Sequence, residues 1–300
     1  MKQRVPEGSA GRPREVARPR EEVMTPASGV VGSRKTRSAL RTIALLYVGI
    51  LVLVPIVLVV YRTFQPGLGS FFDAITDPLA VHAFRLTGEV ALISVVCDTV
   101  FGIGVALLLV RYRFPGKRLL SALIDLPVAV SPIVVGLALV LVYGSSGWFG
   151  GTLDSAGLQV INATPALVMA TVFVSLPLVV RAVVPVLEQA GVEQEQAAAS
   201  LGAKAWTRLW RITLPTIRQA VTYGVVLSLA RCLGEYGAVL VVSGNIEGQT
   251  ETATLRIDNL YEADLQPDAA YAITFVLVLV AIVAILIAAY VRRRQEVLES

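Results

Sequence analysis

The sequence has little of what most enzymes use for chemistry. Its 300 residues include one histidine and two cysteines, and 16% of them are charged. One histidine excludes most metal sites and Ser-His-Asp arrangements, and no zinc-peptidase, serine-hydrolase or phosphate-binding glycine-loop motif is present. Both cysteines, Cys97 and Cys232, lie in apolar stretches, which argues against a disulfide framework. We therefore expect no enzymatic activity, no metal site and no cofactor bound by this chain itself.

What the sequence has in abundance is apolar residues, which make up 55% of it, far more than in a soluble domain. A bilayer core takes roughly 20 apolar residues per helix, and six stretches reach that length. These stretches are residues 42–62, 87–110, 119–143, 164–186, 217–243 and 270–291. The sequence therefore predicts an all-α, polytopic membrane protein with about six transmembrane helices and a transmembrane domain over residues 41–292.

The basic residues are divided unevenly between the connections. The connections on one side contain the following lysines and arginines: Arg34, Lys35, Arg37, Arg41, Arg111, Arg113, Lys117, Arg118, Lys204, Arg208, Arg211, Arg218 and Arg292 to Arg294. The other side has only Arg62, Arg85 and Arg256 near the predicted spans. By the positive-inside rule both ends of the chain are predicted to be cytoplasmic, in a bacterial inner membrane. Clusters of this kind report topology, so we expect membrane lipid and no nucleic acid among the partners.

The two ends differ from the rest in composition. Residues 1–40 are rich in Arg, Pro, Gly, Ser and Glu and lack apolar periodicity, which predicts a disordered cytoplasmic tail. Met24 lies within this tail, and the sequence leaves both Met1 and Met24 open as the start. No cleaved signal peptide is expected, because the first apolar run begins only near Ile43. Residues 293–300 are expected to form a short cytoplasmic tail, and residues 63–86 an interfacial segment.

The longest predicted inner connection, residues 187–216, has a helical pattern. Residues 193–201 are rich in Glu, Gln and Ala, which are strong helix formers, and Gly202 supplies a position for a sharp turn. A second helix is indicated by the spacing of Trp206, Leu209, Trp210 and Thr213. Pro215 is predicted to end that helix, and Thr216 to cap the next one.

This loop resembles the signature of permease subunits of binding-protein-dependent ABC importers: Glu-Ala-Ala, three residues, Gly, nine residues, Ile-x-Leu-Pro. The matching residues are Gln196, Ala197, Ala198, Gly202, Ile212, Leu214 and Pro215. The family's glutamate falls on Gln196, with Glu195 just before it. The resemblance implies a type I importer permease fold and a coupling helix that docks on a cytoplasmic ATPase. Composition alone fits an amphipathic hairpin on the membrane surface equally well.

A second resemblance covers the fifth stretch and its exit. Residues 230–238, 242–246 and 249–252 resemble the sulfate, thiosulfate and molybdate permeases, and residues 254–257 are most like the W-type subunits of sulfate importers. The likeness extends over about residues 40–292. It implies transport of sulfate or thiosulfate, with molybdate or tungstate as the alternative cargo.

The resemblance also implies partners. They are two copies of an ATPase subunit that bind ATP and Mg, a second permease of the T type, and an extracytoplasmic sulfate-binding protein. A separate ATPase agrees with the lack of a Walker-type loop in this sequence. The sequence leaves open which oxyanion is carried and whether the permease pairs with itself or with a homologue.

Charged residues inside the apolar stretches are candidates for the translocation path, because a charge at the bilayer centre is costly. Arg231 and Glu235 are four residues apart and are predicted to pair on one helical face. They either line the path or form a structural pair between helices. Asp125 precedes Pro127 and Pro132, which predict a bend that serves as a gate element or only as a packing kink. An intramembrane hydrolase using Asp98 and Asp125, or a stand-alone secondary transporter, remains as a rival function.

Overall fold

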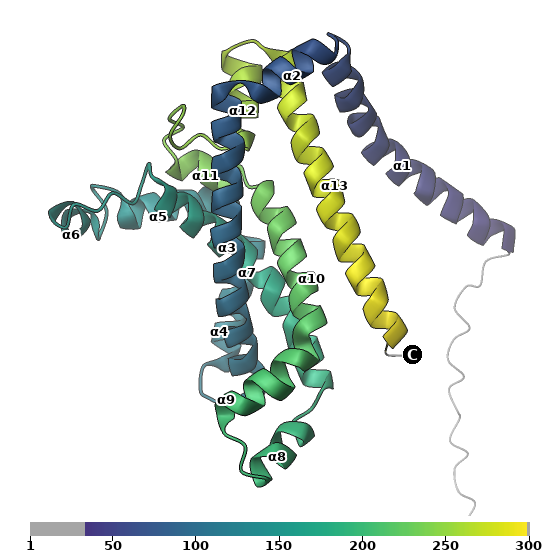
Figure 1. Ribbon diagram of the computed structural model, residues 1–300, viewed down its shortest axis with the longest axis vertical. Helices are drawn as coiled ribbons and strands as arrows, with labels where there is room; N and C mark the ends of the chain where they lie inside the picture. Colours follow the sequence, from purple (N-terminus) through teal and green to yellow (C-terminus); the bar gives the residue numbers. More distant parts are fainter. Residues whose placement is uncertain (1–33, 299–300) are drawn as a thin grey trace, which may run out of the picture. The chain divides into compact units, whose positions relative to one another are not determined.

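The structure, a computed structural model, describes residues 34–298, and every element in that range is a helix (Figure 1). Residues 1–33 of the predicted tail, and residues 299–300, lie outside the described range. The chain divides into two units, residues 1–54 and 55–300, and each is described by itself.

The described part of the first unit belongs to helix α1 (Arg34–Phe64), which continues through Pro55 into the second unit. The helix begins eight residues before the predicted start of the first span at residue 42, so residues 34–40, which we assigned to the tail, are helical. The segment Leu40–Phe64 is long and apolar enough to cross a membrane, and no residue in its most apolar window is buried.

The second unit is organised around four long helices, α3 (Pro78–Arg111), α7 (Thr164–Gln189), α10 (Leu214–Leu233) and α13 (Pro267–Leu298). Helices α3, α7 and α10 pack against one another, and α10 also packs against α13. Small residues allow this close contact, since a Cβ added at Gly102 would lie 2.8 Å from Val179 Cγ1, and one at Gly224 would lie 3.1 Å from Val179 Cα. Val179 and Val183 of α7 are completely buried at this three-helix contact.

Short helices lie at the two ends of the second unit (Figure 1). One end, called the far end below, contains α2 (Leu68–Thr76), α12 (Ala253–Asp258) and the π-helical turn η2 (Asn259–Ala263). The other end, called the loop end, contains α8 (Glu193–Ser200) and α9 (Ala205–Arg208). Helix α3 extends from the far end to the loop end.

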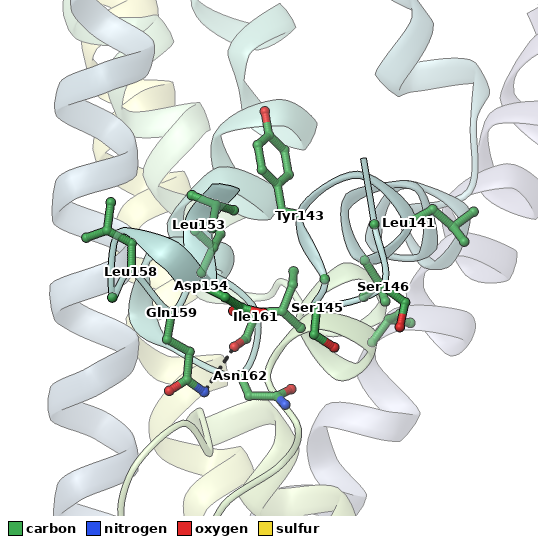
Figure 2. A pocket seen from close by; sticks show the side chains of 16 residues that line it. Leu141, Tyr143, Ser145, Ser146, Leu153, Asp154, Leu158, Gln159, Ile161 and Asn162 are labelled. Carbon is green, nitrogen blue, oxygen red and sulfur yellow. Dashed lines mark hydrogen bonds between the residues drawn. The ribbon is translucent and has the colours of Figure 1, made fainter. Parts of the chain in front are cut away.

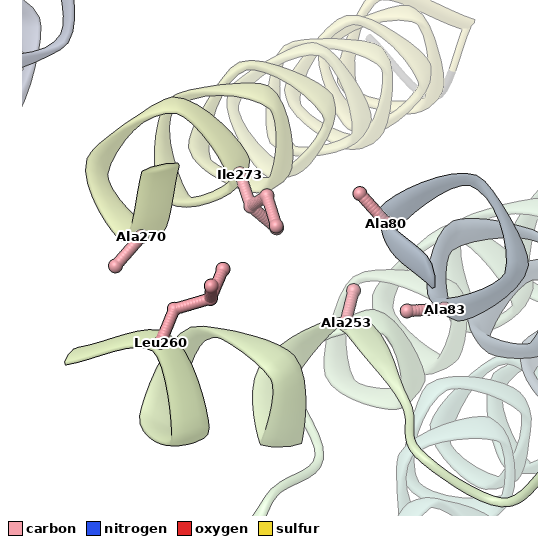
Figure 3. Packing of buried hydrophobic residues seen from close by; sticks show 6 residues of the cluster. All are labelled: Ala80, Ala83, Ala253, Leu260, Ala270 and Ile273. Carbon is pink, nitrogen blue, oxygen red and sulfur yellow. The ribbon is translucent and has the colours of Figure 1, made fainter. Parts of the chain in front are cut away.

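The far end is held together by small and aliphatic side chains. Figure 3 shows the cluster, in which the starts of α3 and α13 meet α12 and η2. Its buried residues are Ala80, Ala83, Ala253, Leu260, Ala270 and Ile273. Helix α3 starts nine residues earlier than the predicted span, because Asp77 caps it by accepting hydrogen bonds from the backbone N–H groups of Leu79 and Ala80, at 2.9 and 3.2 Å. The predicted interfacial segment is therefore reduced to α2 and its flanking turns.

Two of the six predicted spans are not single helices. The third stretch bends between α4 (Lys117–Ala129) and α5 (Pro132–Tyr143), which meet at an angle of 113°, so the bend predicted from Pro127 and Pro132 is confirmed. The fifth ends at Leu233 and resumes as α11 (Gly237–Val242). Within residues 34–298, four helices are long and apolar enough to cross a membrane, or five if the bent pair is one span. Helix α6 (Gly150–Ser155) follows α5.

Candidate functional site

The loop between α7 and α10 has the predicted helix–turn–helix form. Helix α8 ends at Ser200, and Gly202 adopts the left-handed backbone conformation with φ of +82°. The N–H of Gly202 donates to the carbonyl of Ala199 and that of Ala203 to Ala198, at 2.9 and 3.0 Å, which closes the last turn of α8. The chain then enters α9 at Ala205.

The prediction that Pro215 ends the second helix of the loop is wrong. Helix α9 continues through a wider π-helical turn, η1 (Leu209–Thr213), directly into α10. The N–H of Leu214 bonds the carbonyl of Leu209, five residues back. This shift in hydrogen bonding places Pro215 in the first turn of α10, where a missing N–H is tolerated. Thr216 is not a cap, since its hydroxyl donates to the carbonyl of Ile212 at 2.7 Å.

Glu195 fastens α8 to the ends of the long helices. Its Oε1 accepts hydrogen bonds from Arg111 Nη2 at 3.1 Å and from Thr213 Oγ1 at 2.9 Å. Arg111, in the last turn of α3, also donates from Nη1 to the carbonyl of Leu187 in α7 at 3.1 Å. The side chains of Arg111 and Glu195 are only 12% and 20% exposed. One carboxylate thus connects α8 directly with α3 and η1, and through Arg111 with α7.

The residue after Glu195 points the other way. Gln196, which stands where the resembling family has glutamate, is exposed, as is Ala197. Exposed apolar side chains continue this surface on the far side of the turn, where Trp206 and Trp210 stack edge to face with ring centres 5.5 Å apart. We define the loop surface as Gln196, Ala197, Leu201, Trp206 and Trp210. The remaining residues predicted for coupling divide into exposed Gly202 and Pro215 and half-buried Ala198, Ile212 and Leu214.

The two broken stretches cross each other near their breaks. Helix α5 packs on α11, and a Cβ added at Gly237 would lie 3.3 Å from Pro132 Cβ and from Ile133 Cγ1. A Cβ added at Gly136 would lie 2.7 Å from the carbonyl oxygen of Ala238. The backbones approach this closely only because both positions are glycine.

An ion pair lies at the end of α10. Arg231 Nη1 is 2.6 Å from Glu235 Oε2, and the two side chains are 35% and 2% exposed. The predicted contact is present, but not on one continuous helix, because α10 ends at Leu233. Glu235 Oε1 accepts a hydrogen bond from the N–H of Ala238 at 2.9 Å and so also holds the first turn of α11. Glu235 therefore stabilises the break between α10 and α11, and this role does not depend on whether Arg231 lines the translocation path.

A second ion pair lies on the other broken stretch. Asp125 of α4 accepts from Arg181 of α7, with Oδ1 2.8 Å from Nη2 and 2.9 Å from Nε. About half of each side chain is exposed, 51% for Arg181 and 49% for Asp125. We did not predict Arg181 from the sequence, although a lone arginine in the apolar stretch 164–186 was a sufficient signal.

A buried polar cluster joins the three packed helices. Asp98 of α3 is completely buried, and its Oδ2 accepts hydrogen bonds from Ser175 of α7 at 2.5 Å and Ser228 of α10 at 2.6 Å. The thiol of Cys232 donates to Ser175 Oγ at 3.5 Å. Because Asp98 has no exposed surface and Asp125 is paired with Arg181, the two aspartates form no common site for a hydrolase.

A cavity of about 690 Å³ lies between the end of α5, helix α6 and the segment before α7 (Figure 2). Figure 2 shows Ser145, Ser146 and Asn162 at this cavity, and Gln159 Nε2 donating to the carbonyl of Ile161 at 3.3 Å. Its lining contains the carboxylate of Asp154 and neither lysine nor arginine. The cavity is therefore a weaker place for an anion than the two ion pairs.

Comparison with known proteins places these features in a family. Residues 98–297 match the model of the binding-protein-dependent transport system inner membrane component family. The chain belongs to this family. It is accordingly a multi-pass membrane protein and a transport component.

Relatives and solved structures agree with that assignment. The chain is 43% identical over 260 residues to the sulfate transport system permease protein CysW of Synechocystis, covering 87% of this chain and 94% of that protein. It is 39% identical over 214 residues to CysT of Escherichia coli K12, covering 71% and 77%. The fold matches a bacterial alginate ABC transporter, solved with an alginate-bound periplasmic protein, at a TM-score of 0.73 and 18% identity over 87% of this chain and 94% of that chain.

Proposed function

We propose that this chain is a permease subunit of an ATP-driven importer of sulfate or thiosulfate, and that the loop surface receives the motion of a separate ATPase. The observation that carries the proposal is the fixation of α8 by Glu195, which holds an exposed apolar surface rigidly against three membrane helices. A partner can move such a loop as one body, whereas a loose loop would absorb the motion. The high identity to proteins named as sulfate permeases supports the cargo.

The partners and the topology follow from the same proposal. Two copies of the ATPase bind ATP and Mg, and the loop surface is where this chain contacts the ATPase. A T-type permease pairs with this permease, which the likeness to CysT supports. An extracytoplasmic binding protein delivers the anion to the far end, in keeping with the periplasmic protein in the related complex. Both ends of the chain and the loop end are cytoplasmic, because Arg113, Lys117 and Lys204 gather at the loop end.

The translocation path is proposed to pass the crossing of the broken stretches. Broken membrane helices expose backbone polar groups and are tolerated only against protein or a water-filled cavity. Arg231 supplies positive potential there, and Glu235 fixes its position. Asp125, on the other broken stretch, is the acidic residue at the gate.

The test is the assembled complex. The chain is co-expressed with the ATPase, the T-type permease and the binding protein, reconstituted, and assayed for ATP hydrolysis stimulated by sulfate, thiosulfate or molybdate. We expect the largest stimulation with sulfate or thiosulfate, and loss of ATPase co-purification in Trp210→Ser. Trp148→Ser, which removes an exposed tryptophan outside the loop, is the matched control and should co-purify normally. Uptake that persists without the ATPase would overturn the proposal in favour of a secondary transporter.

A further inference from the structure

Arg181 is a charged residue within the apolar stretch of α7, a position where an arginine is costly unless it has a partner or a function. It lies in the second half of α7, eight residues before the helix ends at Gln189, and its neighbours Val179, Val180 and Val183 are buried against the other helices. Arg181 is on the opposite side, where half of its side chain is exposed. A guanidinium is costly in contact with hydrocarbon, so this side of α7 faces protein or a water-filled space.

The ion pair between Arg181 and Asp125 is surrounded by exposed apolar side chains on α4. The neighbours of Asp125 on α4, namely Leu123, Leu126 and Val128, are exposed apolar residues. A structural ion pair needs burial and several hydrogen bonds to offset its desolvation. Asp125 and Arg181 have neither, since both are half-exposed and only one carboxylate oxygen is used.

Arg181 on α7 and Arg231 on α10 lie at different depths along this pair of packed helices. Asp98 bonds Ser175 and Ser228 and thereby sets α7 and α10 level with each other. Arg181 is six residues from Ser175 toward the loop end, about 9 Å at the rise of an α-helix. Arg231 is three residues from Ser228 toward the far end, about 4.5 Å. The backbone positions of Arg181 and Arg231 are thus separated by about 14 Å along the helix axes, one on each side of the Asp98 level.

The contact with Asp125 leaves Arg181 able to bind an anion. A guanidinium has five N–H donors, and Asp125 occupies only Nε and Nη2, through one oxygen. The remaining donors include both hydrogens of Nη1, in the planar arrangement that suits a tetrahedral oxyanion. The neighbouring carboxylate reduces the net positive charge. A transport site needs binding of this moderate strength, because the ion must also leave.

We propose that Arg181 is a second binding station for a divalent tetrahedral oxyanion, on the loop-end side of Arg231, with Asp125 holding the guanidinium in place when the station is empty. The inference rests on the proposed function and adds to it a residue and an order of binding. The anion meets Arg231 first and Arg181 second on its way from the far end.

The first experiment measures sulfate uptake and ATP hydrolysis in proteoliposomes containing the complete complex. We expect Arg181→Gln to lower uptake about tenfold or more, the scale of one lost charge-assisted interaction, while ATP hydrolysis stimulated by the loaded binding protein persists. Arg181→Lys should retain part of the uptake. Normal uptake by Arg181→Gln overturns the second station. A wild-type complex that takes up no sulfate refutes the proposed function instead.

The second experiment tests the side of α7 without depending on activity. Phe173, which is exposed and two turns from Arg181 toward the far end, is replaced by cysteine in a background with Cys97 and Cys232 replaced by serine. We expect an anionic thiol reagent, sulfonatoethyl methanethiosulfonate, to modify Phe173→Cys, and sulfate to slow the modification. The buried control Val180→Cys should stay unmodified. An unreactive Phe173→Cys in the assembled complex shows a covered interface and overturns the proposal, even if Arg181→Gln fails to assemble.

Discussion

Replacement of Glu195 by glutamine is the sharpest test of how the loop is held. The substitution keeps the size of the side chain and an oxygen that can accept from Thr213. It removes the negative charge opposite Arg111, whose guanidinium contacts the carboxylate through both Nε and Nη2, at 3.3 and 3.1 Å. Arg111 then has only neutral acceptors, the carbonyl of Leu187 and the amide oxygen of the glutamine.

The size of the effect follows from burial. Hydrogen bonds to charged groups contribute about 1.5–3 kcal/mol, and an uncompensated buried charge costs more. With 12% and 20% of the two side chains exposed, solvent screens part of this interaction, so we take about 2 kcal/mol for the docking of α8. That corresponds to a shift of about thirtyfold in the equilibrium between docked and released α8.

Hydrogen exchange and coupling report this shift independently. The backbone amides of residues 193–200 should exchange about thirtyfold faster in Glu195→Gln, since local opening governs their exchange. In the reconstituted complex, more ATP should be hydrolysed per sulfate ion imported. Gln196→Ala is the matched control, because Gln196 is exposed and points away from the network, and it should leave the exchange of α8 unchanged. Unchanged exchange in Glu195→Gln would refute the assignment of Glu195 as the anchor.

Three further predictions concern the crossing and the far end. Gly136→Ala should destabilise the protein by about 1–3 kcal/mol, the usual effect of overpacking, seen as a lower Tm in detergent; Gly104→Ala, with open space around it, should not. Glu235→Gln should lower the Tm more than Arg231→Gln, because Glu235 is the more buried partner and also bonds α11; the reverse order would contradict the role given to it. Burial raises the pKa of Glu251, against the opposing effects of Asn259 and Arg256. Its neutral form therefore favours the fold, and this stabilisation is present at low pH and lost as the pH rises through the raised pKa. Proteolysis of residues 244–266 should accelerate as the pH rises through this raised pKa, and less so in Glu251→Gln.

The sequence was informative where a local pattern determines local structure. The apolar stretches gave the long helices, and Gly202 gave the turn of the loop. The pairing of Arg231 with Glu235 was also predictable from their spacing. These features depend on residues a few positions apart, which is the range that a sequence pattern reports.

The break of the fifth stretch was not predictable in the same way. Pro127 and Pro132 predicted a bend in the third stretch, but not its angle of 113°. Residues 217–243 are mostly apolar, and such a composition fits a continuous span and a broken one equally well. The packing of α5 on α11 through Gly136 and Gly237 holds the two broken stretches together, and it is a contact between residues about 100 positions apart. Arg181 itself could have been found as a lone arginine in an apolar stretch, but its pairing with Asp125 could not, since only the fold brings α7 next to α4.

The continuity of the helix through Pro215 connects the two candidate sites. Had the proline ended the helix, as its chemistry suggested, α10 would begin at a flexible joint. Instead one helical path extends from Ala205, through η1, to Leu233, about 40 Å at 1.5 Å per residue. Trp206 and Trp210 lie near its first end and Arg231 near its last. A displacement of the loop surface by a docked partner would therefore reach the break between α10 and α11 directly, and Glu195 determines whether α8 moves with it.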